Sequence, residues 1–275
     1  MTETKNMTNL WNRRHMPRYV TEPFYVPGQN ERNPCISPAI PDGTVLPPVD
    51  LEPGKQYPVM IWCVGGVTGA YESLVARLPE QGIGTAFFRF SANSETPGFP
   101  EVPLEREREA FAALMERIER LNAEQSWIDA ERISVGGTGF GALTAAYALG
   151  ETGKFRRGVL GPAVYDAATA YGTGIAGSMP PVGESLLSFY ETGARHSILT
   201  RIDRIKTPIL FLYDHGDTTV GISQVEEFYS AMKDRNPDVP CRMAVSPENG
   251  PDMTALSDDF LNEIKRWLEE DVHGD

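Results

Sequence analysis

Three glycines at alternate positions, Gly137, Gly139 and Gly141, lie between an apolar run around Ile133 and the helical pattern of residues 140–149. A sharp strand-to-helix turn with this spacing exposes its middle side chain, and a serine there can attack an acyl carbon. The middle residue here is Gly139, which has no side chain. The spacing therefore predicts the turn, whereas the residue type removes the expected nucleophile.

A second position with catalytic chemistry is Asp217, in a loop that follows the apolar run 208–213. In a Ser-His-Asp triad, a carboxylate orients a histidine, and the histidine takes the proton of the nucleophile. His215 lies two residues before Asp217, and His196 lies near the end of the long connection after Tyr165. These two are the candidates for proton transfer among the four histidines of the chain, which are His15, His196, His215 and His273.

Three of the residues near these positions also have a purely structural interpretation. Cys63 lies inside an apolar run, where a free cysteine usually packs as a small apolar side chain. Thr138 comes directly before the middle of the turn, where a side chain normally points away from the pocket. Asp217 could stabilise its own loop by accepting backbone N–H groups in an Asx-turn. For Asp217 the catalytic and the structural interpretations both stay open.

The elements that must hold these residues alternate in type along the chain. Repeated strand–helix units with apolar strands indicate an α/β fold, with a mostly parallel sheet covered by helices on both faces. Strands are expected at 58–64, 84–90, around 133, 158–160, 208–213 and 239–245. Helices are expected at 71–78, from about 104 to 121, at 140–149 and 225–232, and after Ser257.

The predicted organisation is a polar arm at 1–20 followed by one domain over residues 21–275. Residues 18–26 and 35–40 are candidates for antiparallel edge strands. The connection 165–203 is too long for a simple strand–helix link, and it combines glycine and proline with aromatic residues. Such an insertion is typical of a small cap over a pocket, and Tyr165 would help to line that pocket.

The overall charge limits the possible partners. The 275 residues carry a net charge of −13, which argues against nucleic acid and anionic membrane surfaces. No apolar run is long enough to span a membrane, and three widely spaced cysteines without metal-type spacing indicate a reduced, cytoplasmic protein. Nothing in the sequence demands a metal or an organic cofactor. The expected partner is a small-molecule ligand or substrate, and a homo-oligomer is compatible with the sequence.

Three segments together resemble the α/β-hydrolase family, in its prolyl-oligopeptidase and dienelactone-hydrolase branch. The first has the pattern D-x-x-R-I-x-V-x-G at 129–137, the second is the strand and D-x-x-V loop at 207–220, and the third is the segment 246–251 before the last helix. The resemblance covers roughly residues 55–270. It implies the α/β-hydrolase fold for most of the chain.

The resemblance also implies a role for individual positions. It places the nucleophile at Gly139, the acid at Asp217 and the base at Pro251, so two of the three triad positions lack a reactive side chain. It places the oxyanion donors at the backbone of Gly66 or Val67 and of Phe140. The triad is therefore expected to be degenerate, while the backbone donors remain.

The glycine cluster has a rival interpretation as a dinucleotide-binding loop, because it follows a strand and opens a helix. The preceding strand is not the first of the sheet, and the acidic residue expected about twenty residues later is unconvincing. The D-x-x-V loop and the final helix also argue against this interpretation.

The missing nucleophile and base lead to an expected function of non-hydrolytic type. The favoured expectation is a lyase, isomerase or cyclase that acts on a carbonyl-containing small molecule, with backbone donors stabilising an oxyanion. Gly139 would enlarge the floor of the pocket. One alternative is an inactive pseudo-hydrolase that serves as a binding or assembly module. The other is an esterase-like hydrolase with a non-standard nucleophile.

Overall fold

The computed structural model of the protein describes residues 40–65, 69–90, 104–170, 185–215, 217, 220–246 and 258–270. Within these ranges the chain forms a seven-stranded sheet with helices on both faces, which confirms the predicted α/β fold. In order across the sheet, the strands are β1 (Val45–Leu46), β3 (Gly84–Arg89), β2 (Tyr57–Gly65), β4 (Ile128–Gly139), β5 (Gly158–Leu160), β6 (Ile209–Asp214) and β7 (Cys241–Ser246).

The sheet is parallel except at one edge. β1 pairs antiparallel with β3, and every other pair of neighbouring strands is parallel. Parallel strands that are covered on both faces consist of nearly continuous apolar residues. All six residues of β6 are buried, as this arrangement requires. Burial on both faces therefore explains the apolar runs in the sequence.

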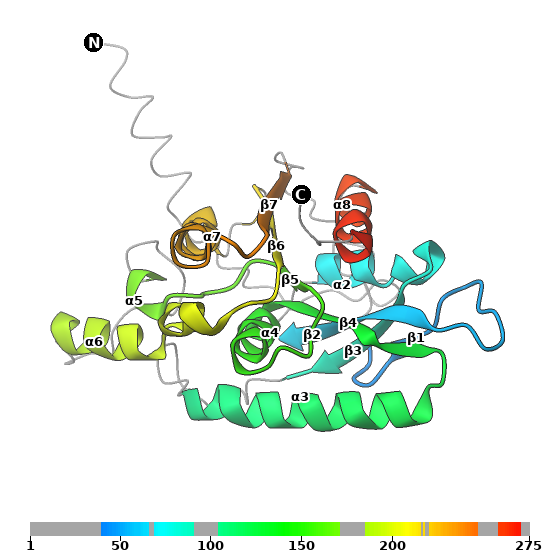
Figure 1. The fold of residues 1–275 in the computed structure, drawn as a ribbon. Coiled ribbons are helices and arrows are strands. Elements are labelled where there is room, and N and C mark those ends of the chain that lie inside the picture. Colours follow the sequence, from blue (N-terminus) through cyan, green and yellow to red (C-terminus); the bar gives the residue numbers. More distant parts are fainter. Residues whose placement is uncertain are drawn as a thin grey trace, which may run out of the picture.

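Helices cover the sheet in two layers (Figure 1). One face carries α3 (Leu104–Glu124), α4 (Phe140–Glu151) and α7 (Ile222–Arg235), and the other carries α2 (Gly69–Val75), the 3-10 helix η1 (Leu78–Gln81) and α8 (Asp258–Glu269). The indole N–H of Trp267 on α8 donates to the carbonyl of Gly158 on β5 over 3.1 Å. This bond ties the last helix to the middle of the sheet.

The boundaries of most elements agree with the sequence pattern. α3 begins at Leu104, and α8 buries the predicted stripe of Phe260, Leu261, Ile264, Trp267 and Leu268. β4 begins earlier than expected because Ile128 already pairs with Tyr57 of β2; the register then shifts, and the pairing resumes between Val59 and Ile133. The pattern does not predict β1, because two residues are too few to show a period. The expected edge strand at 18–26 and all but the last residue of the one expected at 35–40 lie outside the described residues.

The region that the sequence predicts as a cap is described in part. It contains the helices α5 (Ala167–Ala170) and α6 (Leu186–His196) and the 3-10 helix η3 (Ile198–Arg204). α6 begins with a serine cap, in which the side chain of Ser185 accepts a hydrogen bond from the N–H of Ser188. Residues 171–184 lie outside the described part, as does the arm at 1–20. The cap and the arm therefore remain predictions.

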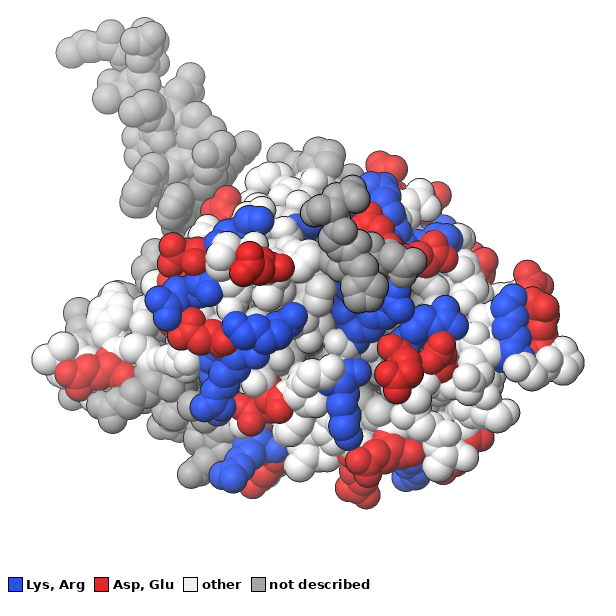
Figure 2. Space-filling view, in the orientation of Figure 1, with Lys and Arg blue, Asp and Glu red and all other residues white. Residues whose placement is uncertain are grey.

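Charged side chains of both signs are interspersed on the face shown in Figure 2. The described part of the chain also contains ion pairs between at least partly exposed side chains, for example Arg235–Asp203 and Arg242–Glu270. The negative net charge is thus not gathered into one acidic patch on this face. In the described part of the chain, no helix is long and apolar enough to cross a membrane.

Candidate active site

The parallel strands end at a common edge of the sheet. Their last residues are Arg89 on β3, Gly65 on β2, Gly139 on β4, Leu160 on β5, Asp214 on β6 and Ser246 on β7. In open α/β sheets, ligands bind outside this carboxyl edge. The backbone N–H of His215 donates to the carbonyl of Ser246 over 3.3 Å, so the segments that follow β6 and β7 are joined here. The fold thus brings Gly139 and the loop of Asp217 to the same edge.

Gly139 connects β4 to α4 in a backbone conformation that glycine adopts easily and other residues do not. Its φ is 55° and its ψ is −130°. The N–H of Gly139 donates to the carbonyl of Pro162 over 2.8 Å. Phe140 is the first residue of α4, so its N–H lies at the positive end of the helix dipole. An oxyanion that formed beside this helix end would be stabilised by the dipole and by the N–H groups.

Backbone segments meet around this turn too closely to admit side chains. A Cβ atom on Gly139 would lie 2.3 Å from the carbonyl oxygen of Gly65, and one on Gly141 would lie 1.8 Å from that of Cys63. Gly65 and Gly137 are enclosed in the same way. The expectation that Gly139 enlarges a pocket floor is therefore wrong, because the backbone of β2 occupies the space.

Asp217 stabilises the loop that follows β6. Its Oδ1 accepts a hydrogen bond from the N–H of Val220 over 2.9 Å, and its own N–H donates to the carbonyl of Asp214 over 2.9 Å. The hydroxyl of Tyr213 donates to the carbonyl of Val220 over 3.0 Å. Burial raises the pKa of this hydroxyl to about 12, and the negative charge of Asp217 adds to the rise. The loop-stabilising role is thus present in the structure, and a catalytic role of Asp217 remains a prediction.

The other predicted triad and oxyanion positions are described only in part. His215 is exposed, and its ring lies edge-on to that of Tyr213 with 5.9 Å between the ring centroids. His196 is the last residue of α6, and its side chain lies outside the described part of the chain, as do the whole residues Gly66, Val67 and Pro251. The roles predicted for these residues therefore remain predictions.

Tyr165 lies in the hydrophobic core on the face of α7. Its ring packs edge-on against Phe211 and Phe228, with centroid distances of 6.3 and 5.0 Å. Its buried hydroxyl donates to the carbonyl of Gly161 over 2.5 Å. Since both the ring and the hydroxyl have partners in the protein, the structure gives Tyr165 a packing role beneath the carboxyl edge.

A buried carboxyl group lies beside the turn, and the sequence pattern does not reveal it. Glu72, in the first turn of α2, is only 5% exposed, and its Oε1 accepts a hydrogen bond from the Thr138 hydroxyl over 3.5 Å. Burial raises the pKa of Glu72 from its ordinary 4.5 to about 7. An acidic residue in the first turn of a helix usually faces solvent and complements the helix dipole, so the residue type at this position gives no sign of burial.

The cysteine nearest the turn does not supply a nucleophile. Cys63 is fully buried on β2, and burial raises the pKa of its thiol, whereas reactivity requires the thiolate. Its side chain packs within the core formed under α3 and α4. The described residues include no group of three His, Cys, Asp or Glu side chains that could hold a metal ion.

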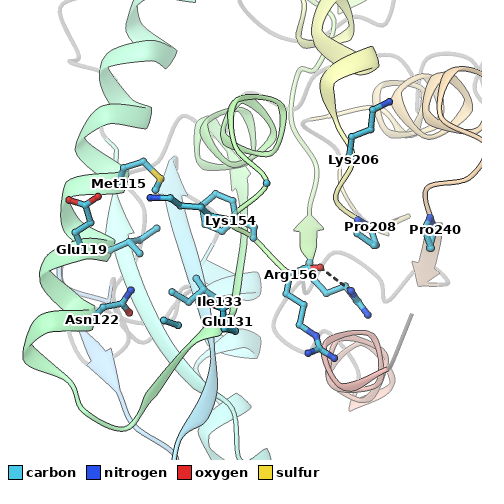
Figure 3. A pocket seen from close by; sticks show the side chains of 15 residues that line it. Met115, Glu119, Asn122, Glu131, Ile133, Lys154, Arg156, Lys206, Pro208 and Pro240 are labelled. Carbon is cyan, nitrogen blue, oxygen red and sulfur yellow. Dashed lines mark hydrogen bonds between the residues drawn. The ribbon is translucent and has the colours of Figure 1, made fainter. Parts of the chain in front are cut away.

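A pocket of about 860 Å³ opens at the opposite, amino edge of the sheet (Figure 3). Met115, Glu119 and Asn122 of α3 form one wall, and Pro208 and Pro240, which directly precede β6 and β7, lie across from them. Gly139 and the loop of Asp217 lie at the carboxyl ends of the strands. This pocket is therefore separate from the candidate active site.

The sheet order, the two helical layers and the glycine turn at the carboxyl edge define a protein of the α/β-hydrolase fold. Residues 105–272, more than half of the chain, match the prolyl oligopeptidase family. The chain belongs to this family, which confirms the family resemblance seen in the sequence motifs. No curated protein matches the chain.

Several solved structures that share the fold are peptidases. A Pyrococcus horikoshii acylaminoacyl peptidase superposes with a TM-score of 0.64 at 20% identity, covering 84% of this chain and 40% of the peptidase. A Mycobacterium tuberculosis puromycin-hydrolyzing peptidase gives 0.57 at 19% identity, covering 82% and 38%. A sugar hydrolase from Lactococcus lactis gives 0.59 at 16% identity, covering 82% and 94%. The chain thus spans about 40% of the length of these peptidases, and the likenesses establish the fold.

Family membership corrects the function expected from the sequence. A lyase, isomerase or cyclase is contradicted, because the family and the peptidases among the structural neighbours point to peptidase-type hydrolysis. The comparison gives no support to a pseudo-hydrolase that acts as a binding module. The expectation rested on two positions, Gly139 and Pro251, whereas the family match rests on the pattern of 168 consecutive residues from 105 to 272.

Proposed function

We propose that the protein is a hydrolase of peptide-type bonds, which cleaves an amide or ester of a small acylated substrate at the carboxyl edge of its sheet. The observation that carries the proposal is the family match over residues 105–272, which includes the turn at Gly139, the loop of Asp217 and α8. The proposal assigns the N–H of Phe140, at the N-terminus of α4, to the stabilisation of the oxyanion of an acyl transfer reaction, which is a role that a helix N-terminus suits.

The proposal includes a degenerate triad, with Gly139 in the nucleophile position and Pro251 in the base position. Gly139 has no hydroxyl, so no acyl-enzyme can form on it, and water attacks the acyl carbon directly. When a triad enzyme loses its triad, binding and the oxyanion donors still accelerate the reaction by about 10³–10⁴-fold over water. Hydrolysis by this protein is therefore expected to be slow and measurable.

The test is a panel of p-nitrophenyl esters and N-acylated amino acid and dipeptide p-nitroanilides. We expect hydrolysis that co-purifies with the 30.3 kDa chain. Asp217→Asn keeps an acceptor for the N–H of Val220 and removes the ionisable group. A role of Asp217 in proton transfer predicts a loss of at least about tenfold in kcat/KM, whereas its loop-stabilising role predicts no loss.

Asp129→Asn is the matched control, because Asp129 accepts the N–H of Glu131 over 3.0 Å near the start of β4, far from the carboxyl edge. Its activity should equal that of the wild type. If no member of the panel is hydrolysed, the proposed function is wrong. If both variants lose activity equally, Asp217 has no specific role in it.

A further inference from the structure

The carboxyl group of Glu72 is buried without a full set of hydrogen bonds. The long bond from the Thr138 hydroxyl is its contact at Oε1, and Oε2 has no hydrogen-bond partner among the described residues. Buried carboxylates normally have several donors, because the desolvation of an unpaired charge is costly. Oε2 of Glu72, close to the turn at Gly139, is therefore a buried acceptor that a water or a ligand could satisfy.

The groups around Glu72 come from several elements. The Trp62 indole N–H on β2 lies close enough to favour the charged carboxylate, but it makes no hydrogen bond of normal geometry in the described part of the chain. Arg89 at the end of β3 favours the charged form from a greater distance. The adjacent hydroxyl of Tyr71 is also buried without a hydrogen-bond partner among the described residues. Burial raises its pKa, and the negative charges of Asp217 and Asp214 add to the rise.

We propose that Glu72 is the proton acceptor of the hydrolytic reaction, and that it activates the water that replaces the missing nucleophile. This inference rests on the function proposed above. Its geometric basis is the position of the carboxyl group, which contacts Thr138, the residue directly before Gly139. The unused Oε2 provides the acceptor for the water.

The proposed step is balanced in atoms and electrons. The water oxygen forms a bond to the acyl carbon, its proton passes to the Glu72 carboxylate, and the carbonyl electron pair moves onto oxygen beside the N-terminus of α4. When the carbonyl re-forms, the bond to the leaving nitrogen or oxygen breaks, and Glu72 returns the proton to the leaving group. A carboxyl group whose pKa lies near 7 can both accept and return a proton at neutral pH.

Thr138 is a positioning residue in this scheme. Its buried hydroxyl donates to Glu72 Oε1 and leaves Oε2 for the water. A purely structural role of the Thr138–Glu72 pair would affect folding, but it would leave the dependence of kcat/KM on pH unchanged. The pH profile therefore separates the two roles.

The experiment measures kcat/KM from pH 5 to pH 9 on the best substrate of the panel. We expect the wild-type value to rise with pH through about 7, because Glu72 must be ionised to accept the proton. Glu72→Gln should lower kcat/KM by about 10²–10⁴-fold and abolish this rise. Thr138→Val should lower kcat/KM and shift the pH at which kcat/KM rises. Thr138→Ser should restore both the value of kcat/KM and this pH.

Glu107→Gln is the matched control, because Glu107 on α3 also accepts a threonine hydroxyl, that of Thr144, over 3.0 Å. Its kcat/KM and pH profile should equal those of the wild type. If Glu72→Gln does not fold, the variants Thr138→Val and Thr138→Ser test the role of Glu72 in its place. The role of Glu72 is overturned, and the proposed function stands, if the wild type is active and the kcat/KM of Glu72→Gln stays within threefold of it. The same conclusion follows if the Thr138 variants leave the pH profile of kcat/KM unchanged. If the wild type hydrolyses nothing, both proposals are overturned.

Discussion

Replacing Gly139 with alanine adds one methyl group where β2, β4 and α4 meet. The new Cβ would lie 2.3 Å from the carbonyl oxygen of Gly65, whereas ordinary contacts begin near 3.4 Å, so the backbone must move by about 1 Å. Overpacking of this kind costs about 1–3 kcal/mol. The positive φ of 55° adds a further cost of roughly 1–2 kcal/mol for a residue with a side chain. Together they should lower the free energy of unfolding by about 2–5 kcal/mol.

Urea and thermal unfolding, followed by tryptophan fluorescence, measure this loss. Gly54→Ala is the matched control, since Gly54 has a φ of 80° and no atom within 4 Å of an added Cβ. It carries the cost of the positive φ without the steric contact. The difference between the two losses in the free energy of unfolding measures the steric contact, and it should be about 1–3 kcal/mol. Each kcal/mol should lower Tm by about 2–4 °C.

Equal losses in Gly139→Ala and Gly54→Ala would refute the reasoning, because β2 and β4 would then not approach each other as closely as the structure has them. With the contact present, Gly139→Ser should not create an active serine nucleophile by itself. The serine needs the same Cβ, and the strands must separate to admit it.

Two further substitutions test the buried polar groups. Because the folded pKa of Glu72 is about 7 and its ordinary value is 4.5, the unfolded chain releases this proton first as pH rises, and stability falls between these values by up to about 3 kcal/mol. Glu72→Gln removes this fall in stability. The urea midpoint of the variant minus that of the wild type should therefore be larger at pH 8 than at pH 4, and an equal difference at the two pH values would contradict the burial of the charge. Tyr165→Phe removes the 2.5 Å hydrogen bond to Gly161 and keeps the ring, so it should cost about 1–3 kcal/mol in urea unfolding. A loss of activity without a loss of stability would instead place Tyr165 in the substrate pocket.

The sequence predicts the fold well because burial of both sheet faces leaves a strong pattern. The run 208–213 corresponds to β6, which is buried at every residue, and the stripe of α8 follows from a helix with one buried face. The two-residue strand β1 leaves no pattern. The polar residues 129–132 give no strand signal either, although they lie in β4, because solvent reaches the first part of that strand.

The sequence predicts the active site less well because burial of a polar group depends on contacts between distant segments. Glu72 and Thr138 are 66 residues apart, and nothing near Glu72 in the sequence indicates that its carboxyl is buried. Tyr165 lies next to a glycine-rich insertion, which suggests a pocket, yet its hydroxyl is held by Gly161. The turn at Gly139 could be predicted because its glycines are local, but the packing of β2 against it could not.

The glycine junction of β2, β4 and α4 also limits the mutational paths open to this chain. At Gly65, Gly137, Gly139 and Gly141 a single added methyl group meets backbone atoms of another segment at 1.8–2.4 Å. A side chain at position 139 therefore requires the backbone of β2 to move, which should lower the stability of the protein. A glycine at this junction is therefore difficult to replace by a single substitution. A single substitution that adds a side chain here is expected to lower stability before it can add chemistry.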